Sequence, residues 1–253
     1  MKKVLLFVML AFATGLLFSC TSDDPESSSG SSSSFDNDGQ DGSSSSAGNG
    51  GTGSLPYGGQ TYKTVKIGEQ TWFAENLNYN PNTGNSACYD NEPSNCGIYG
   101  RLYDWSTAMG FPSSCNSNDC AIQIQPKHRG ICPPGWHIPN NDDWYKLFRY
   151  VDNVTGSGLY DSPTAGKHLK AVNGWNPAGR ENLDTYEFSA LPGGIGFGLD
   201  GGFRLIDFYG YWWSANENGS GSAYSLRMGD INDDISWFKE SNNKLFSVRC
   251  LQD

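Results

Sequence analysis

Residues 132–151, with the sequence CPPGWHIPNNDDWYKLFRYV, constrain the fold of this chain more than any other stretch. Their first half is rigid, because two consecutive prolines fix φ and the glycine after them permits a turn. In the second half, Asn140 can cap a helix whose third position is Asp143. Apolar side chains then follow at i, i+3, i+4 and i+7, namely Trp144, Leu147, Phe148 and Val151. This spacing predicts a helix that packs one apolar face against a core and that follows almost directly on a cysteine.

The other periodic segments are short. Residues 62–67 and 70–73 alternate around a Gly-Glu pair and predict a hairpin. A short helix is expected at 102–109, and a second main helix from Ser162-Pro163 to about Val172. Short apolar runs between Gly and Asn turns predict strands at 186–191, 209–214, 223–228 and 246–250. We therefore expect an α+β domain with two main helices beside small antiparallel sheets.

Five ordered motifs point to a family. They are CPPGWHIP at 132–139, the helix bearing Trp144, ALPGG at 190–194, GYWWSANE at 210–217 and FSVRC at 246–250. Together they resemble the Fibrobacter succinogenes major paralogous domain family over nearly the whole of residues 57–253. That family is similar in fold to C-type lectin-like and sulfatase-modifying-factor domains, and its members are mostly surface or secreted proteins. The resemblance implies a lectin-like fold with long irregular loops and an exported location, but no established chemistry.

Seven cysteines are present, and six remain once Cys20 is set aside. An even number in an exported chain predicts disulfides, for which six cysteines allow fifteen connectivities. Proximity favours Cys88 with Cys96 and Cys115 with Cys120, two pairs that a plain family member lacks. Cys132 and Cys250 are left, and their pairing matches the resemblance. A zinc site is the alternative, but no C-x-x-C occurs and the three histidines lack ligand spacing.

The N-terminus predicts the cellular compartment. Lys2 and Lys3 precede an apolar run over 4–18, which is too short to span a bilayer comfortably and matches a signal-peptide core. The run ends in Leu-Phe-Ser-Cys, which resembles a lipobox, so we expect residues 1–19 to be removed and Cys20 to be lipidated. Ser22-Asp23-Asp24 also resembles the acidic export tag of Bacteroidetes-type surface lipoproteins. The prediction is an exported outer-membrane lipoprotein at the cell surface; a simple secretory signal is the alternative.

Residues 20–54 then read as an acylated cysteine and a disordered tether, and residues 55–253 as the folded domain. Twenty of the 34 residues in 21–54 are Ser or Gly, six are acidic and none is Lys or Arg. So little apolar surface cannot offset the entropy of ordering the chain. The full chain carries −10; without the two N-terminal lysines and the six acidic tether residues, the domain carries −6. This charge argues against nucleic acid as a partner, and leaves the lipid anchor as the only expected membrane contact.

Candidate ligand-binding residues lie in the C-terminal half. Aromatic rings can stack on sugar faces, and the candidates are Trp175, Tyr209, Tyr211 and Trp237. Of these, Trp175 and Trp237 are expected at the surface, whereas at least one of the adjacent Trp212 and Trp213 should lie in the core. Asp230, Asp233 and Asp234 form the densest cluster of oxygen ligands, which calcium would prefer. A solvated turn is the favoured interpretation of that cluster, so no cofactor is expected.

Other motifs carry less weight. GFGLDG at 196–201 fits a dinucleotide-binding pattern, yet no helix pattern follows it. Glu92-Pro93-Ser94 is similar to the Glu-Pro-Asn of sugar-binding lectins but lies far upstream. No G-x-S-x-G or H-x-x-H-x-E run occurs, and His137 is expected to be packed or hydrogen-bonded.

We therefore expect a non-catalytic binding or adhesion domain on a surface lipoprotein, with a glycan or cell-wall polysaccharide as ligand. A structural or protein–protein interaction module of the envelope is one alternative. An enzyme of the formylglycine-generating type is another.

Overall fold

The computed structural model describes residues 51–156, 161–198 and 201–253. Internal contacts divide the chain into Met1–Ser44 and Ser45–Asp253, and all described residues lie in the second unit. The expected signal peptide, Cys20 and most of the tether lie outside the described residues. Strand β1 begins at Thr52, so the last residues assigned to the tether, 52–54, are part of a strand instead. They are ordered because β1 pairs along its whole length with β2.

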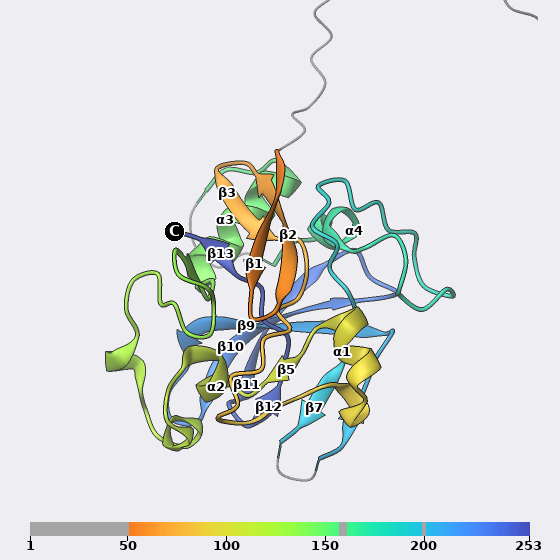
Figure 1. Cartoon of the computed structure of the whole chain (residues 1–253). Helices are drawn as coiled ribbons and strands as arrows, with labels where there is room; N and C mark the ends of the chain where they lie inside the picture. Colours follow the sequence, from red (N-terminus) through yellow and green to blue (C-terminus); the bar gives the residue numbers. More distant parts are fainter. Residues whose placement is uncertain (1–50, 157–160, 199–200) are drawn as a thin grey trace, which may run out of the picture. The chain divides into compact units, whose positions relative to one another are not determined.

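The described residues form four antiparallel sheets, with the helices beside them (Figure 1). The largest has the order β1-β2-β3-β13-β6, with bounds Thr52–Tyr57, Gln60–Ile67, Gln70–Phe73, Leu251–Gln252 and Trp136–His137. The second is β11-β10-β9, with bounds Ile235–Ser241, Ser222–Gly229 and Tyr209–Glu217. The third is β12-β7-β8, with bounds Lys244–Leu245, Ile195–Phe197 and Phe203–Arg204. The smallest pairs β4, Ser86–Ala87, with β5, Leu102–Tyr103.

The helices are α1 (Pro93–Tyr99), α2 (Trp105–Met109), α3 (Asn141–Asp152) and α4 (Ala165–Leu169), with 3-10 turns at Tyr89–Asn91, Ser113–Asn116 and Ala121–Gln123. The predicted α+β class is confirmed: helices are few and the sheets small and antiparallel. No helix in the described residues is both long and apolar enough to cross a bilayer.

Helix α3 has the predicted boundaries. Asn140 accepts from the backbone N–H of Asp143, and Asp143 accepts in return from that of Asn140, so two of the free donors at the helix start are satisfied. Trp144, Leu147 and Phe148 are fully buried. At about 1.5–3 kcal/mol each, their burial is the main stabilisation that fixes α3 against the sheets.

The apolar side chains form two main clusters. One lies where β3, α3 and α4 meet the β9–β11 sheet, and Trp72, Trp144 and Trp212 are among its members. The other gathers β2, α2 and the far side of β9 around Trp105, Trp213 and Phe246. Trp212 and Trp213 therefore enter different clusters because they point to opposite faces of β9. Both are fully buried, which confirms the expectation of at least one core tryptophan.

The hairpin expected from 62–73 is confirmed, and so are the strands expected near 209–214 and 223–228. Other predictions were wrong. Residues 102–109 split into β5 and α2, and the second main helix is only Ala165–Leu169. Ser162 still stabilises the start of α4, because the Oγ of Ser162 accepts from the N–H of Ala165 at 2.8 Å. The runs 186–191 and 246–250 are irregular, with isolated bridges in place of strands.

Candidate functional site

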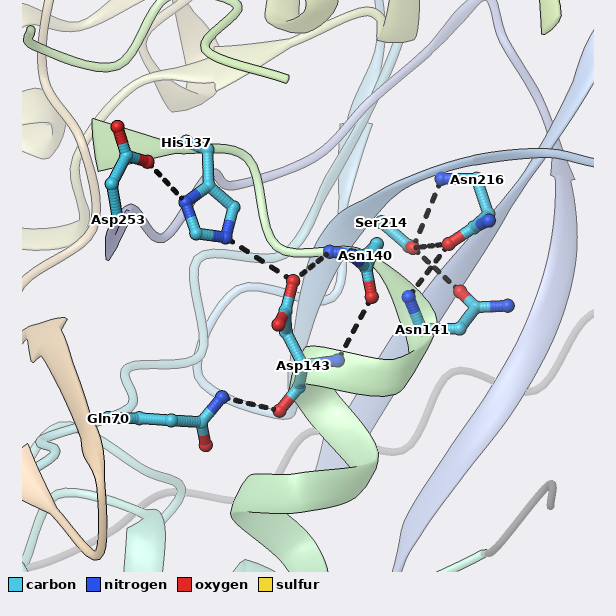
Figure 2. Close-up of polar contacts among 8 residues, drawn as sticks. All are labelled: Gln70, His137, Asn140, Asn141, Asp143, Ser214, Asn216 and Asp253. Carbon is cyan, nitrogen blue, oxygen red and sulfur yellow. Dashed lines mark hydrogen bonds and ion pairs between the residues drawn. The ribbon is translucent and has the colours of Figure 1, made fainter. Parts of the chain in front are cut away.

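Two adjoining polar networks hold the start of α3 in place (Figure 2). In the first, the ring of His137 lies between two carboxylates: Nδ1 is 2.8 Å from Asp253 and Nε2 is 3.3 Å from Asp143. His137 is buried, as the sequence predicted, and Gln70 adds a bond to the backbone oxygen of Asp143 at 3.0 Å. This network joins β3, β6, α3 and the end of β13, so it positions the helix.

The second network fixes two amides. The backbone N–H of Asn141 donates to Oδ1 of Asn216 at 2.7 Å, so that atom must be oxygen. Ser214 Oγ accepts from the backbone N–H of Asn216 at 3.2 Å and donates to Oδ1 of Asn141 at 2.6 Å. Both amide oxygens are therefore engaged. Neither Nδ2 group has a hydrogen-bond partner among the residues that the structure describes, so two oriented donors remain available.

These amides line a pocket of about 530 Å³ at the N-terminus of α3. Its other polar lining includes Asp142, which is exposed, and Tyr145, which is almost fully buried. The hydroxyl of Tyr145 has no hydrogen-bond partner within the described ranges. Burial is the largest cause that raises the pKa of this hydroxyl, to about 12, and nearby Asp161 adds to the shift. Lys127 also lines the pocket, so its ammonium balances the Asp142 carboxylate, and the two amide donors suit a neutral ligand rich in hydroxyl groups.

Sequence reasoning missed this pocket. The sequence predicts a capping role for Asn140. It predicts no site at Ser214 or Asn216, which lie in the GYWWSANE motif that carries the family resemblance. A signal was present: Ser214 and Asn216 follow the tryptophans of β9 at alternating positions, so both face the same way.

The three disulfides are those expected. Cys88 pairs with Cys96, Cys115 with Cys120, and Cys132 with Cys250. The last bond joins the turn before β6 to the residue before β13. It therefore fixes the two strands that carry or flank His137 and Asp253.

The aromatic candidates do not form one surface. The expectation for Trp175 was wrong: it is only 8% exposed, because its Nε1 donates to the carbonyl of Ala190 at 3.0 Å. Tyr211 is also buried, stacked on Phe246 at 4.9 Å. Tyr209 and Trp237 are partly exposed. Trp237 packs against Tyr145 with ring centroids 4.9 Å apart, which places it behind the pocket wall.

The acidic turn has partners within the protein. Asp230 accepts from Asn176 at 2.9 Å, Asp233 pairs with Arg180 at 2.8 Å, and Asp234 accepts from Ser236 at 2.7 Å. In the described part of the chain, no group of three or more His, Cys, Asp or Glu side chains could hold a metal ion.

A buried cation lies beside this turn. The ammonium of Lys170 donates to the carbonyls of Gly229 at 2.8 Å and Asn232 at 2.6 Å, and lies 5.1 Å from the Trp175 ring. Burial lowers the pKa of Lys170, and the aspartates of the turn act in the opposite direction. The Lys170 ammonium thus supplies positive charge beside the acidic turn, at the place where a bound metal ion would supply it.

The two weaker motifs have structural roles. Residues 195–197 of the GFGLDG region form β7, which pairs antiparallel with β8, so no strand–helix unit for a dinucleotide follows; positions 199–200 lie outside the described residues. Glu92 and Pro93 begin α1, with the proline at a first-turn position.

The chain was compared with models of protein families, with curated proteins and with solved structures. The sequence model described as the Fibrobacter succinogenes major domain matches residues 65–252, which is most of the chain. Comparisons with curated proteins and with solved structures found no match.

Proposed function

This chain belongs to the Fibrobacter succinogenes major domain family, and from that premise we propose that it is a non-catalytic glycan-binding module with a C-type lectin-like fold. In this proposal a lipid on Cys20 anchors it at the surface of the outer membrane, and the Ser/Gly-rich segment keeps the domain clear of the bilayer. The ligand is a neutral stretch of polysaccharide bound at the start of α3.

One observation carries the proposal: Asn141 and Asn216 present Nδ2 donors whose orientation is set by the protein before any ligand arrives. Side chains that are already fixed lose little conformational entropy when a ligand binds. For a flexible side chain, this loss of entropy is a main cost in the free energy of binding. Sugar hydroxyls accept from such donors and donate to a carboxylate, which Asp142 provides at the same pocket.

Two supporting points concern the alternatives. The six cysteines of the described region are all in disulfides, which leaves no thiol pair there for formylglycine-type chemistry. An envelope protein as ligand would need a continuous contact area, whereas the polar lining of this pocket fits a small repeating unit.

Asn216→Asp and Asn141→Asp test the proposal. Each change keeps the Oδ1 acceptor that the network uses and replaces the Nδ2 donor with a second oxygen, so folding should be retained. A negative charge at the first turn of α3 also favours the helix. The wild-type domain should bind neutral polysaccharides on an array, and each variant should bind at least about tenfold more weakly.

The matched control is Asn173→Asp, at an exposed asparagine that does not line the pocket, which should bind like the wild type. Unchanged binding by the two pocket variants at unchanged thermal stability would contradict the assignment. Capture of an envelope protein with no polysaccharide binding would favour the interaction-module alternative.

A further inference from the structure

A second cavity, of about 440 Å³, is lined in part by residues 129–131, the continuation of the segment 124–128 that lines the pocket at α3. Its walls come from the end of β1, residues 79–84, the end of α2 and residues 129–131. His128 lines the pocket at α3 and Arg129 lines this cavity, so adjacent residues face different sites. The two sites have no lining residue in common, and each can be tested without the other.

Three aromatic rings line this cavity, and all are held firmly. Tyr57 and Tyr79 have ring centroids 4.9 Å apart, and the hydroxyl of Tyr57 donates to the carbonyl of Ile131 at 3.0 Å. A Cβ at Gly58 would lie 2.6 Å from the ring of Tyr79, so that ring packs directly on the glycine backbone, whose φ is +58°. Phe111 packs against His128 with centroids 4.8 Å apart. All three rings are only partly buried, so ring surface remains open to solvent.

The cavity has one charged side chain among its lining residues, Arg129, and no acidic one. Arg129 is exposed, and Nη1 of its guanidinium donates to the carbonyl of Cys132 at 3.3 Å. That contact uses one of five N–H groups and sets the direction of the side chain. Burial raises the pKa of the Tyr57 hydroxyl and Tyr79 adds to the shift, while Arg129 acts in the opposite direction.

We propose that this cavity is a second binding site, which takes an acidic sugar such as a hexuronate residue of a polysaccharide. The apolar face of the sugar ring stacks on the open aromatic surface at Tyr79 and Phe111, and the sugar carboxylate pairs with Arg129. Aromatic rings alone would accept any apolar face, whereas a planar guanidinium beside them selects a carboxylate through two parallel hydrogen bonds. A nucleic acid offers similar chemistry, but the domain charge of −6 opposes a long polyanion, and the single cation of this cavity suits one carboxylate rather than a run of phosphates.

The test is calorimetric titration of the intact domain with trigalacturonate and with its fully methyl-esterified, neutral form, at low salt. The wild type should bind the acid at least tenfold more tightly than the ester. Arg129→Gln should remove that difference, and Arg129→Lys should restore part of it, because a lysine keeps the charge but not the paired donors. Tyr79→Ala should weaken binding of both forms, while Tyr79→Phe should not.

Asn216→Asp serves as the cross-control, since it alters only the pocket at α3. Its binding of trigalacturonate should equal that of the wild type even if the glycan proposal for that pocket fails. Equal affinity of the wild type for acid and ester, or full binding by Arg129→Gln, would overturn the inference. So would tight binding of a proline-rich peptide that Tyr79→Ala abolishes and Arg129→Gln leaves intact, because the cavity would then be a peptide groove.

Discussion

Arg249 donates two hydrogen bonds to a single oxygen of Asn76, from Nε at 3.1 Å and from Nη2 at 3.0 Å, across 173 residues of sequence. Trp212 donates to the same oxygen at 2.9 Å. The remaining acceptors of the guanidinium are the backbone carbonyls of Phe73, Phe188 and Ser189. Arg249 is fully buried, and its direct contacts among the described residues are with neutral oxygens and the ring of Phe188. The arginine of the FSVRC motif therefore connects the C-terminal segment to residues 73–76 near the start of the domain and to residues 188–189.

Replacing Arg249 should be severely destabilising. Burial lowers the pKa of its guanidinium to about 9, while Asp184 and Glu75 act in the opposite direction. Arg249→Lys keeps the charge but has three donors in place of five, so buried acceptors lose their partners at about 1–3 kcal/mol each. We expect the free energy of unfolding in urea to fall by about 3 kcal/mol or more. Arg204→Lys, at an exposed arginine, is the control and should change little.

The disulfides should differ in their contributions. Cys132 and Cys250 are 118 residues apart, whereas Cys88 and Cys96 are eight apart. In the loop-entropy account the long bond is worth about 5 kcal/mol and the short one about 2.5 kcal/mol. Double alanine variants of each pair, compared by denaturant unfolding, should therefore rank in that order. A larger loss from the short pair would show that local geometry, not loop closure, sets their stabilisation.

Glu217 should make stability depend on pH. Its Oε2 accepts from the N–H of Cys120 at 2.8 Å, while Oε1 is buried with no partner in the described residues. Burial is the largest cause that raises the pKa of Glu217; Cys120 opposes the shift and Asp119 adds to it. Because the folded pKa lies above the unfolded one, the stabilising contribution is complete below about pH 4.3 and is lost as pH rises through the folded pKa.

Glu217→Gln should therefore raise the melting temperature at pH 7 and flatten its fall above pH 4.3. The amide oxygen can still accept from Cys120, and the amide nitrogen can donate to Asp119. Glu181→Gln, at an exposed glutamate, should leave the pH profile as it is in the wild type. An unchanged profile in Glu217→Gln would refute the assignment.

Calcium should not stabilise the acidic turn. Asp230 and Asp233 already have partners, and the ammonium of Lys170 lies beside the turn. We expect thermal unfolding to be the same in millimolar calcium and in chelator. Lys170→Met should destabilise the domain by about 2 kcal/mol or more, because two buried carbonyls lose their donor. A rise in melting temperature with calcium, abolished by Asp233→Ala with Asp234→Ala, would instead assign a metal site there.

Lipidation should depend on Cys20 alone. Cys20→Ala should release the domain from the membrane fraction or leave its signal peptide uncleaved. Fractionation and mass spectrometry of the intact protein measure both results. The same fractionation and mass for wild type and variant would exclude a lipid anchor at this residue.

How far the sequence predicts this domain depends on how local the determining contacts are. The cap and apolar stripe of α3 are encoded within a dozen residues, and the pattern located the helix correctly. Trp175 was misplaced because its burial depends on a carbonyl from Ala190, which no local pattern reveals. The same holds for Arg249, where a buried charge becomes plausible only once its distant carbonyl partners are known. The amides at 141 and 216 were missed because their fixed orientation results from contacts between α3 and β9.

The position of β13 has a consequence for the newly made chain. Leu251 pairs with Trp72 on one side and with His137 on the other, so a strand from residues 251–252 completes a sheet that begins at residue 52. A nascent chain leaves the ribosome from its N-terminus, and strands β1 to β3 are therefore made long before β13, which pairs with the edge of β3. Until residue 252 emerges, the edge of β3 is an open template for pairing with other chains. If β1 to β3 fold only after residue 252 has been made, this edge is protected. If translation slows shortly before residue 252 while β1 to β3 are already folded, the edge stays exposed for longer.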